Sequence, residues 1–362
     1  MEDFCVKSFI AMIVIVSMTL VLVACAGPAA APEYVRAVPV TPADSDRVPE
    51  VPDDQPYGSG VVSGEHVTIG ILQIAAHLAL DAAREGFISG LADLGWVEGD
   101  NLTFIPFNAH GDISNAHAMA AMIVESEPDL ILGIATATSQ ALANATETIP
   151  IVITAVTNPL LAGLVESFDR PNTNVTGTSD LTPVASQFEL MQRILPDVQT
   201  VGIIFNAGEI NAQIQVDWAM DKARELGLYY ETITVASTAD VAQAVEAIIG
   251  RVDVIYAPTC NTLAAAMSTV AMIADENGIP IIGGEESHVF LGALATEGIN
   301  YYRLGRQAST MAAQILRGEA IPQEMPIQWQ EDLNVVVNIS AAERLGITIP
   351  EEILSIAEIF EE

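Results

Sequence analysis

The feature that most constrains the fold is a repeated order of buried strands and amphipathic helices. Continuous apolar runs, such as residues 67–73 and 200–206, are typical of strands buried on both faces of a parallel sheet. Each run is followed by a helical period that ends at a glycine, Gly95 in the first copy and Gly227 in the second. Three strands return at similar spacing: 132 residues from Gly70 to Gly202, 124 from Asp129 to Asp253 and 130 from Pro150 to Pro280. The repetition predicts an α/β protein of two doubly wound, parallel-sheet lobes with like topology.

The end of the folded part predicts how the two lobes are connected. Two late strands, near residues 293–299 and 333–338, flank one helix at 303–317, and we expect the chain to cross between the lobes there. A first crossing is expected at residues 178–182. Together these crossings predict a three-segment hinge with a cleft between the lobes. The expected lobes are residues 66–182 plus 300–325 and residues 183–299 plus 326–362.

The N-terminal segment, residues 1–25, has the pattern of a bacterial secretory signal. Its apolar run, residues 9–23, leads into the sequence Leu-Val-Ala-Cys, which resembles a lipobox in which Cys25 becomes the lipidated first residue of the mature protein. An uncleaved membrane anchor is the alternative, because the run approaches the length that spans a bilayer. Residues 26–64 are rich in Pro, Ala and acidic residues, which predicts a disordered tether. Both interpretations place the folded part outside the cytoplasmic membrane, held there by its anchor.

Charge and cysteine content exclude several classes of function. The chain has 47 acidic and 13 basic residues, and its formal net charge of −34 argues against nucleic acid as a partner. Once Cys5 leaves with the signal and Cys25 carries lipid, Cys260 is alone, so the mature chain can form no internal disulfide. A buried structural role is the commoner one for such a cysteine. An enzyme with Cys260 as nucleophile, next to His288 and Glu285, is the alternative.

Motifs for cofactor, metal and hydrolase chemistry are missing from the sequence. No glycine-rich dinucleotide or phosphate loop follows a strand, and no Gly-x-Ser-x-Gly elbow occurs. The five histidines are not paired with one another or with cysteine at metal-ligand spacing. We therefore expect no cofactor, no metal and no enzymatic activity.

The cleft is expected to collect the side chains at the strand ends. In open parallel sheets ligands bind beyond the carboxyl ends of the strands, so two facing lobes place these ends on one cleft. Most of these side chains are polar and few are charged, which suits a small polar or zwitterionic ligand. They include Gln73, His77, Thr136, Ser139, Thr154 and Asp180 in the first lobe and Asn206, Asn211, Thr259, Asn261 and Glu285 in the second.

Two ends of such a ligand can be matched to these residues. The helix that starts at Thr138 and Ser139 could hold a carboxylate with its free N–H groups. Asp180, Glu285 and Glu286 could hold an ammonium group. For any single Ser or Thr at these positions, helix capping is the alternative role.

Several stretches resemble the TrpX-like ABC transporter substrate-binding lipoproteins. The most specific is residues 292–307, GALATEGINYYRLGRQ, and residues 70–87, 135–145 and 206–211 agree with it. The resemblance covers about residues 66–350 and implies a type I periplasmic-binding-protein fold. It also implies an aromatic or related amino acid as ligand, an ABC permease with its ATPase as partners, and ligand-binding roles for the eleven strand-end residues given above.

Two positions depart from the family pattern. Asn158 and Cys260 stand where the family often has aspartate, and both changes remove a carboxylate from the expected cleft. Asp180 and Glu285 then remain as partners for a ligand ammonium. We expect a monomer that delivers its ligand to the permease. A sensor domain that reports its ligand to a membrane signalling partner is the alternative function.

Overall fold

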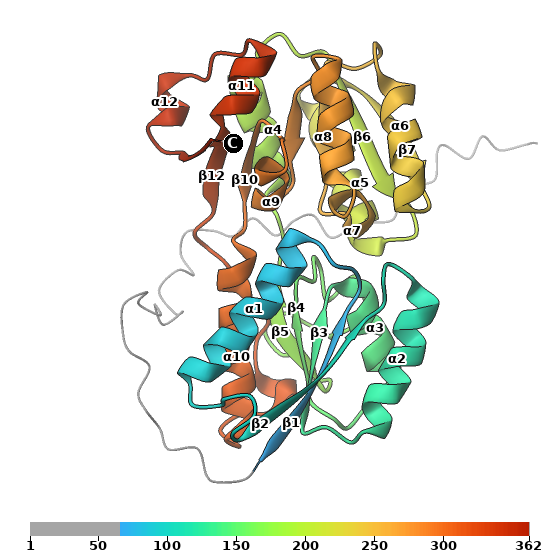
Figure 1. The fold of residues 1–362 in the computed structure, drawn as a ribbon, viewed down its shortest axis with the longest axis vertical. Coiled ribbons are helices and arrows are strands. Elements are labelled where there is room, and N and C mark those ends of the chain that lie inside the picture. Colours follow the sequence, from blue (N-terminus) through green and yellow to red (C-terminus); the bar gives the residue numbers. More distant parts are fainter. Residues whose placement is uncertain (1–65, 362) are drawn as a thin grey trace, which may run out of the picture. The chain divides into compact units, whose positions relative to one another are not determined.

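The computed structural model describes residues 66–361 of the chain (Figure 1). The chain divides into two units, Met1–Gln55 and Pro56–Glu362, and all described residues belong to the second. The expected signal segment 1–25, the lipidation site Cys25 and the tether 26–64 lie outside the described residues. No helix within residues 66–361 is both long enough and apolar enough to cross a bilayer.

Two sheets divide the described chain into two lobes. The first sheet has six strands, which all pair in parallel. In sheet order these are β11 (Gln328–Trp329), β5 (Val175–Ser179), β4 (Ile151–Thr154), β3 (Leu130–Ile134), β1 (Val67–Gln73) and β2 (Leu102–Asn108). The helices of this lobe are α1 (Leu78–Asp93), α2 (Ile113–Glu125), α3 (Thr136–Ala145), α10 (Tyr301–Leu316) and the short η3 (Pro322–Glu324).

The second sheet has seven strands, in which β10 and β12 form the antiparallel pair. In sheet order the strands are β13 (Glu358–Phe360), β12 (Asn334–Asn338), β10 (Ala295–Gly298), β9 (Ile281–Gly283), β8 (Val254–Ala257), β6 (Thr200–Asn206) and β7 (Tyr229–Val235). The helices are α4 (Val184–Ile194), α5 (Ile210–Glu225), η2 (Thr238–Asp240), α6 (Val241–Ile248), α7 (Asn261–Ala264), α8 (Met267–Glu276), α9 (Glu286–Phe290), α11 (Ile339–Leu345) and α12 (Glu351–Leu354). The predicted pair of doubly wound α/β lobes is confirmed.

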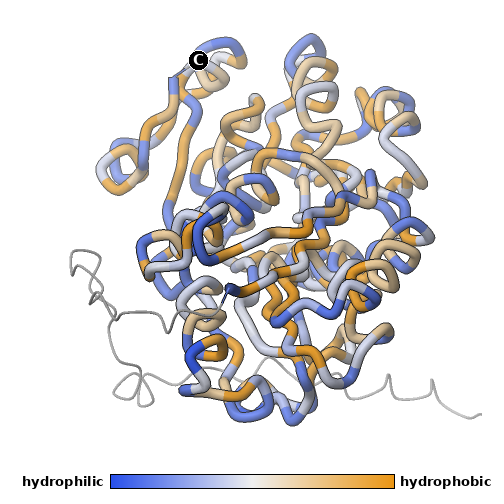
Figure 2. Tube along the Cα trace, turned by 60° about the horizontal axis from the view of Figure 1, so that its bottom comes forward, coloured by the Kyte–Doolittle hydropathy of each residue, from blue (hydrophilic) through white to orange (hydrophobic). Residues whose placement is uncertain are grey.

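Each lobe has its own hydrophobic core between its sheet and its helices. All five residues of β3 and all four of β8 are buried, as expected for strands covered on both faces. In Figure 2 much of the hydrophobic colour lies in the interior of the trace, while the hydrophilic colour is frequent on its outer turns. The two cores contain different residues, so the lobes can pack independently of one another.

Helix α10 follows β10 of the second sheet in the chain but belongs to the first lobe. It packs along α1, and small residues let the two backbones approach closely (Figure 1). A Cβ atom at Gly305 of α10 would lie 1.9 Å from the carbonyl oxygen of Ala83, and one at Gly86 of α1 would lie 2.0 Å from that of Tyr302. No real side chain tolerates such distances, so glycine at these positions sets the spacing of the two helices.

The chain passes between the two sheets three times. The crossings are residues 180–183 between β5 and α4, 299–300 between β10 and α10, and 330–333 between β11 and β12. Asn300 joins the second crossing to the third, because its backbone N–H and C=O both bond to the side chain of Gln330, at 3.1 and 2.6 Å.

The structure corrects two details of the expected connection. The strands near 293–299 and 333–338 do not themselves cross; they form β10 and β12 of the second sheet, and the crossings lie beside them. The range 326–362, expected in the second lobe, begins with β11, which pairs with β5 in the first sheet. A two-residue edge strand carries too weak a local pattern to be assigned from sequence.

Candidate functional site

A small cavity of about 10 Å³ lies between the two lobes. It is lined by His77, Leu80, Ala155, Asp180 and Tyr301 from the first lobe and its crossing segments, and by Asn211, Thr259, Cys260, Asn261, Ala264 and Glu285 from the second. Six of the eleven predicted residues are in this lining, and the lining contains no Lys or Arg. We call this space the inner cavity.

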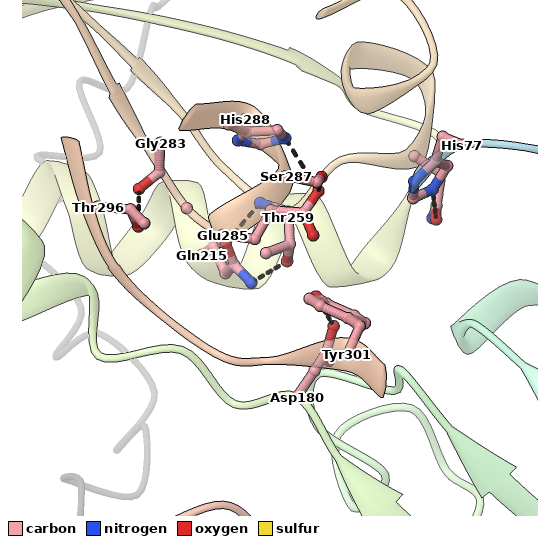
Figure 3. A network of polar contacts seen from close by, with 12 residues as sticks. His77, Asp180, Gln215, Thr259, Gly283, Glu285, Ser287, His288, Thr296 and Tyr301 are labelled. Atoms are coloured by element: carbon pink, nitrogen blue, oxygen red, sulfur yellow. Dashed lines mark hydrogen bonds and ion pairs between the residues drawn. The ribbon is translucent and has the colours of Figure 1, made fainter. Parts of the chain in front are cut away.

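Asp180 reaches the inner cavity from the first crossing. Its Oδ2 accepts a hydrogen bond of 2.6 Å from the hydroxyl of Tyr301, at the start of α10, while its Oδ1 is buried without a partner (Figure 3). Burial raises the pKa of the Asp180 carboxyl to about 6; the side chains of Tyr301 and Thr157 oppose this rise, and the negative charge of Glu285 adds to it. Asp180 therefore presents one unpartnered oxygen to the cavity.

Glu285 faces the same cavity from the second lobe, at the residue before α9. Its Oε1 accepts a hydrogen bond of 2.9 Å from the Ser287 hydroxyl and lies 3.2 Å from His288 Nε2, whereas its Oε2 is buried without a partner. Burial by itself would raise the pKa of Glu285, but His288, His77 and Ser287 together outweigh burial and lower it. The cavity thus contains a second buried carboxylate oxygen that lacks a partner.

His77 and Asn261 connect the two lobes across the cavity. The Nε2 atom of His77, which precedes α1, lies 3.2 Å from Asn261 Oδ1 at the start of α7. The amide of Asn261 is oriented by Glu209, which accepts a bond of 2.8 Å from its Nδ2. Asn261 Oδ1 must then accept, so His77 Nε2 donates and its other ring nitrogen, Nδ1, is left buried without a partner.

The second-lobe wall of the cavity is held by side chains of α5. Asn211 Nδ2 donates to the carbonyl oxygen of Thr259 at 2.8 Å. Gln215 accepts from the backbone N–H of Thr259 at 2.9 Å and donates to its hydroxyl. The polar atoms of Thr259 are therefore largely occupied within the lobe, and this residue shapes the wall.

The other five predicted residues do not line the inner cavity. Four of them use their polar atoms in hydrogen bonds within their own lobe. Gln73 bonds to Asp81 and Arg84 of α1, and Ser139 donates to the carbonyl of Ala135. Thr154 accepts from Thr178, and Asn206 bonds to Thr262 and Gly208. The fifth, Thr136 at the start of α3, has a buried hydroxyl without a partner. A position after a strand therefore does not by itself tell whether a side chain points to the ligand or back into its own lobe.

Tyr301 is the polar residue of the cavity that our strand-end reasoning did not select. It opens α10, which follows the second crossing, and no strand of the first lobe ends there. It is 121 residues from its partner Asp180. A signal was available in residues 292–307, the stretch with the most specific resemblance, which contains this tyrosine.

Cys260 and Asn158, the two departures from the family pattern, have structural contacts. Cys260 is fully buried and donates its S–H to Glu209, at 3.4 Å. Burial raises the pKa of this thiol well above its usual value, and the charge of Glu209 adds to the effect, so the thiolate needed for a nucleophile is disfavoured. Asn158 is absent from the cavity lining, and its side chain accepts from the N–H of Leu161 in a turn.

A larger and more open hollow, of about 370 Å³, lies next to the inner cavity and shares Asn211 with it. Its walls come from α2, α3, the loop after Asn158 and the start of α5. None of its lining side chains has a buried polar atom without a partner, whereas His77, Asp180 and Glu285 of the inner cavity each have one. Because buried polar atoms rarely stay unpaired, the inner cavity is the better candidate for a ligand's charged groups. Within residues 66–361, no group of three or more His, Cys, Asp and Glu side chains could hold a metal ion.

Comparison with known proteins agrees with this architecture. Residues 68–360 match the family described as ABC transporter substrate binding protein. A tyrosine-binding protein of Clostridioides difficile is 38% identical over 278 residues, which are 76% of this chain and 80% of the relative. At 16% identity, the leucine-binding protein of Thermotoga maritima shares only the fold, with a TM-score of 0.55 over 77% of this chain and 87% of that one.

Two solved structures of similar identity differ in how well they superpose. An ABC domain from Streptococcus pneumoniae in complex with L-Trp is 35% identical and gives a TM-score of 0.79, over 82% of this chain and 99% of that one. A substrate-binding protein from Clostridium difficile, solved ligand-free and open, is 37% identical over the same shares but gives a TM-score of 0.63. The present structure therefore superposes better on the ligand-bound relative than on the ligand-free, open one.

Proposed function

Because this chain belongs to the ABC transporter substrate-binding protein family, whose members bind solutes and are not enzymes, we propose that it captures an aromatic α-amino acid between the two lobes, with the ligand's charged groups at the inner cavity. We further propose that it delivers this ligand to the permease and ATPase of an importer, outside the cytoplasmic membrane. The tyrosine-binding relative and the L-Trp complex support an aromatic amino acid as the ligand.

One observation carries the proposal most directly. Two buried carboxylate oxygens, Asp180 Oδ1 and Glu285 Oε2, lack partners in one cavity that contains no Lys or Arg. Leaving charged oxygens buried and unpaired is costly, so the cavity is suited to a ligand that brings its own positive charge. An α-ammonium group, with three donors, can bond to both oxygens at once.

The rest of the lining suits the other parts of an aromatic amino acid. His77 Nδ1 is free to bond to a polar group of the ligand while Nε2–H stays on Asn261. Leu80, Ala155 and Ala264 supply apolar surface near these groups. Ser139, whose hydroxyl is bonded within α3, is not part of this arrangement.

Closure of the two lobes is the mechanism we propose for capture. The ligand first binds to one lobe of an open form, and rotation about the three crossings then brings the other lobe over it. The contact of His77 with Asn261 joins the lobes in the arrangement seen here. The better superposition on the L-Trp complex than on the ligand-free, open relative supports this interpretation.

Anchoring through Cys25 completes the proposal and rests on the sequence of residues 1–25. A lipid on this residue, followed by the tether 26–64, would keep the two lobes at the membrane surface near a permease. Mass spectrometry of the membrane-extracted mature protein would show a lipidated N-terminal Cys25; a mature chain that retains residues 1–24 would contradict the cleaved anchor.

Calorimetric titration tests the proposed ligand class. Tryptophan, tyrosine and phenylalanine should bind, and their deaminated analogues, which keep the ring and the carboxylate, should bind at least tenfold more weakly, a difference of about 1.4 kcal/mol. Equal binding of the deaminated analogues would refute the ammonium site. Absence of binding by all these compounds would refute the ligand class.

A further inference from the structure

We propose that His288 is a positioning residue for ligand binding, which holds Glu285 as a charged carboxylate with its second oxygen turned to the ligand's ammonium group. This inference rests on the proposed amino-acid site and names a residue outside the cavity lining. His288 lies in α9 and acts through Glu285, without a contact to the ligand itself.

The geometry of the pair is the first support. The His288 side chain is fully buried, the Glu285 side chain is 2% exposed, and Nε2 lies 3.2 Å from Oε1 (Figure 3). This is ion-pair distance, although neither ring nitrogen of His288 makes a hydrogen bond of normal geometry. Oε1 of Glu285 is thus directed to His288 and Ser287, which leaves Oε2 for the cavity.

Burial of this imidazole carries a cost. A Cβ atom at Gly283 would lie 2.7 Å from the Cβ of His288, so the strand before α9 needs glycine there for any side chain at position 288. A buried ring with two poorly paired nitrogens also costs free energy that an apolar side chain would not. A polar group maintained under these conditions is better explained by its effect on Glu285 than by packing.

The charges around Glu285 show what this effect is. Asp180 on the first crossing and Glu286 on α9 are acidic neighbours and oppose a charge on Glu285, as burial does. Tyr301 of α10 faces the same group as a neutral phenol, since burial raises its pKa. His77, just before α1, and His288 on α9 are the basic neighbours, and His288 is the stronger of the two influences that lower the pKa of Glu285.

His288 therefore favours Glu285 as the charged one of the two cavity carboxyls. Like charges that share a cavity cannot both ionise easily. With His288 in place Glu285 ionises first, and Asp180, whose pKa is raised, is the group that binds a proton as the pH falls. The ligand's ammonium then meets at least one carboxylate across the whole neutral range.

The test compares amino-acid affinity across pH in wild type and in His288→Gln, which keeps polar contact but has no charge. We expect tryptophan or tyrosine to bind His288→Gln at least tenfold more weakly at pH 6, with part of the loss recovered at pH 8 as Glu285 ionises. The deaminated analogues, which have no ammonium, should bind both proteins equally. His288→Asn serves as the second variant if the glutamine does not fit the buried site, and thermal melting shows which variant is folded.

A double-mutant cycle separates positioning from a purely structural effect. In a Glu285→Gln background, His288→Gln should cause less than a twofold further change, because its partner charge is already gone. A His288→Gln protein with wild-type affinity and pH profile would overturn the inference, as would a further tenfold loss in the Glu285→Gln background. Wild type that binds none of the amino acids would instead overturn the proposed function.

Discussion

Replacing Asp180 with asparagine removes one charge from the inner cavity while keeping the shape of the side chain. Asparagine retains an oxygen that can accept the 2.6 Å bond from Tyr301, so the first crossing and the start of α10 should stay in place. What the variant loses is the negative charge next to the unpartnered oxygen Oδ1. The substitution therefore acts on a cationic ligand group more than on the fold.

The size of the effect follows from burial. Asp180 is 4% exposed, so a ligand ammonium in the closed cavity is screened little by water. Loss of one charged partner should weaken amino-acid binding at least tenfold, about 1.4 kcal/mol. Glu285 remains as the second carboxylate, so binding should be weakened and not abolished.

The pH dependence gives the same prediction a second, independent readout. A cation binds best to the ionised carboxylate, so affinity should rise with pH through the pKa of Asp180, which burial raises to about 6. Wild type at pH 5 should bind an aromatic amino acid roughly tenfold more weakly than at pH 7.5, because most of Asp180 is protonated there. Asp180→Asn should lack this step.

Calorimetry at pH 5, 6 and 7.5 on wild type and Asp180→Asn measures both effects. Tyr301→Phe is the matched control: it removes the hydrogen bond but not the charge, so the pH step should persist and move to higher pH, because this bond lowers the pKa of Asp180. An Asp180→Asn protein with unchanged affinity, or with the wild-type pH step, would refute the assignment of Asp180 to the ligand ammonium.

Three further predictions concern the hinge and the packing of the lobes. Burial raises the pKa of Glu286, which bonds to Asn300 at the second crossing and to Asn334 in β12, to about 7, so its native form holds a proton more tightly than the unfolded chain does. Its contribution to stability is full below about pH 4.5 and is lost as the pH rises through 7. In denaturant unfolding between pH 5 and 8, the free energy of unfolding of Glu286→Gln should therefore fall less than that of wild type, by on the order of 2 kcal/mol. Parallel curves for the two proteins would contradict this. Gly305→Ala should lower the free energy of unfolding by about 1–3 kcal/mol, because the new methyl group meets a backbone carbonyl of α1. The control Gln314→Ala, on the exposed side of α10, should change it by less than about 0.5 kcal/mol. Equal melting temperatures of the two variants would count against close helix packing as the reason for glycine. Small-angle scattering should show a smaller radius of gyration at saturating ligand if the lobes close about the crossings, and an unchanged radius would exclude closure.

Local patterns in the sequence are sufficient for the order of elements and for the two-lobe fold. The apolar run at residues 200–206 coincides with β6, and the helical period from Asp81 to Leu94 lies within one turn of the bounds of α1. The reason is that strand burial and helix amphipathicity are written into neighbouring residues. Less regular segments, such as β11, take their conformation from a partner strand about 150 residues away and have little pattern of their own.

The candidate site depends on the local sequence pattern and on the tertiary structure. The sequence alone places polar side chains at the strand ends, because parallel sheets bring those ends to one edge, and this rule reaches His77, Asp180 and Glu285. It does not distinguish them from Gln73 or Ser139, which are also polar and lie in similar positions but bond within their own lobe.

What the tertiary structure alone decides is which polar atoms remain without a partner. Asp180 keeps a free oxygen because Tyr301, 121 residues away, satisfies the other one, and Glu285 keeps one because His288 and Ser287 draw its first oxygen to the opposite side. Hydrogen bonds and burial depend on groups that meet only when remote segments pack together, so no local pattern encodes them. The sequence thus shows which residue types line the cleft, whereas their charges and unpartnered polar atoms are decided only when the two lobes come together.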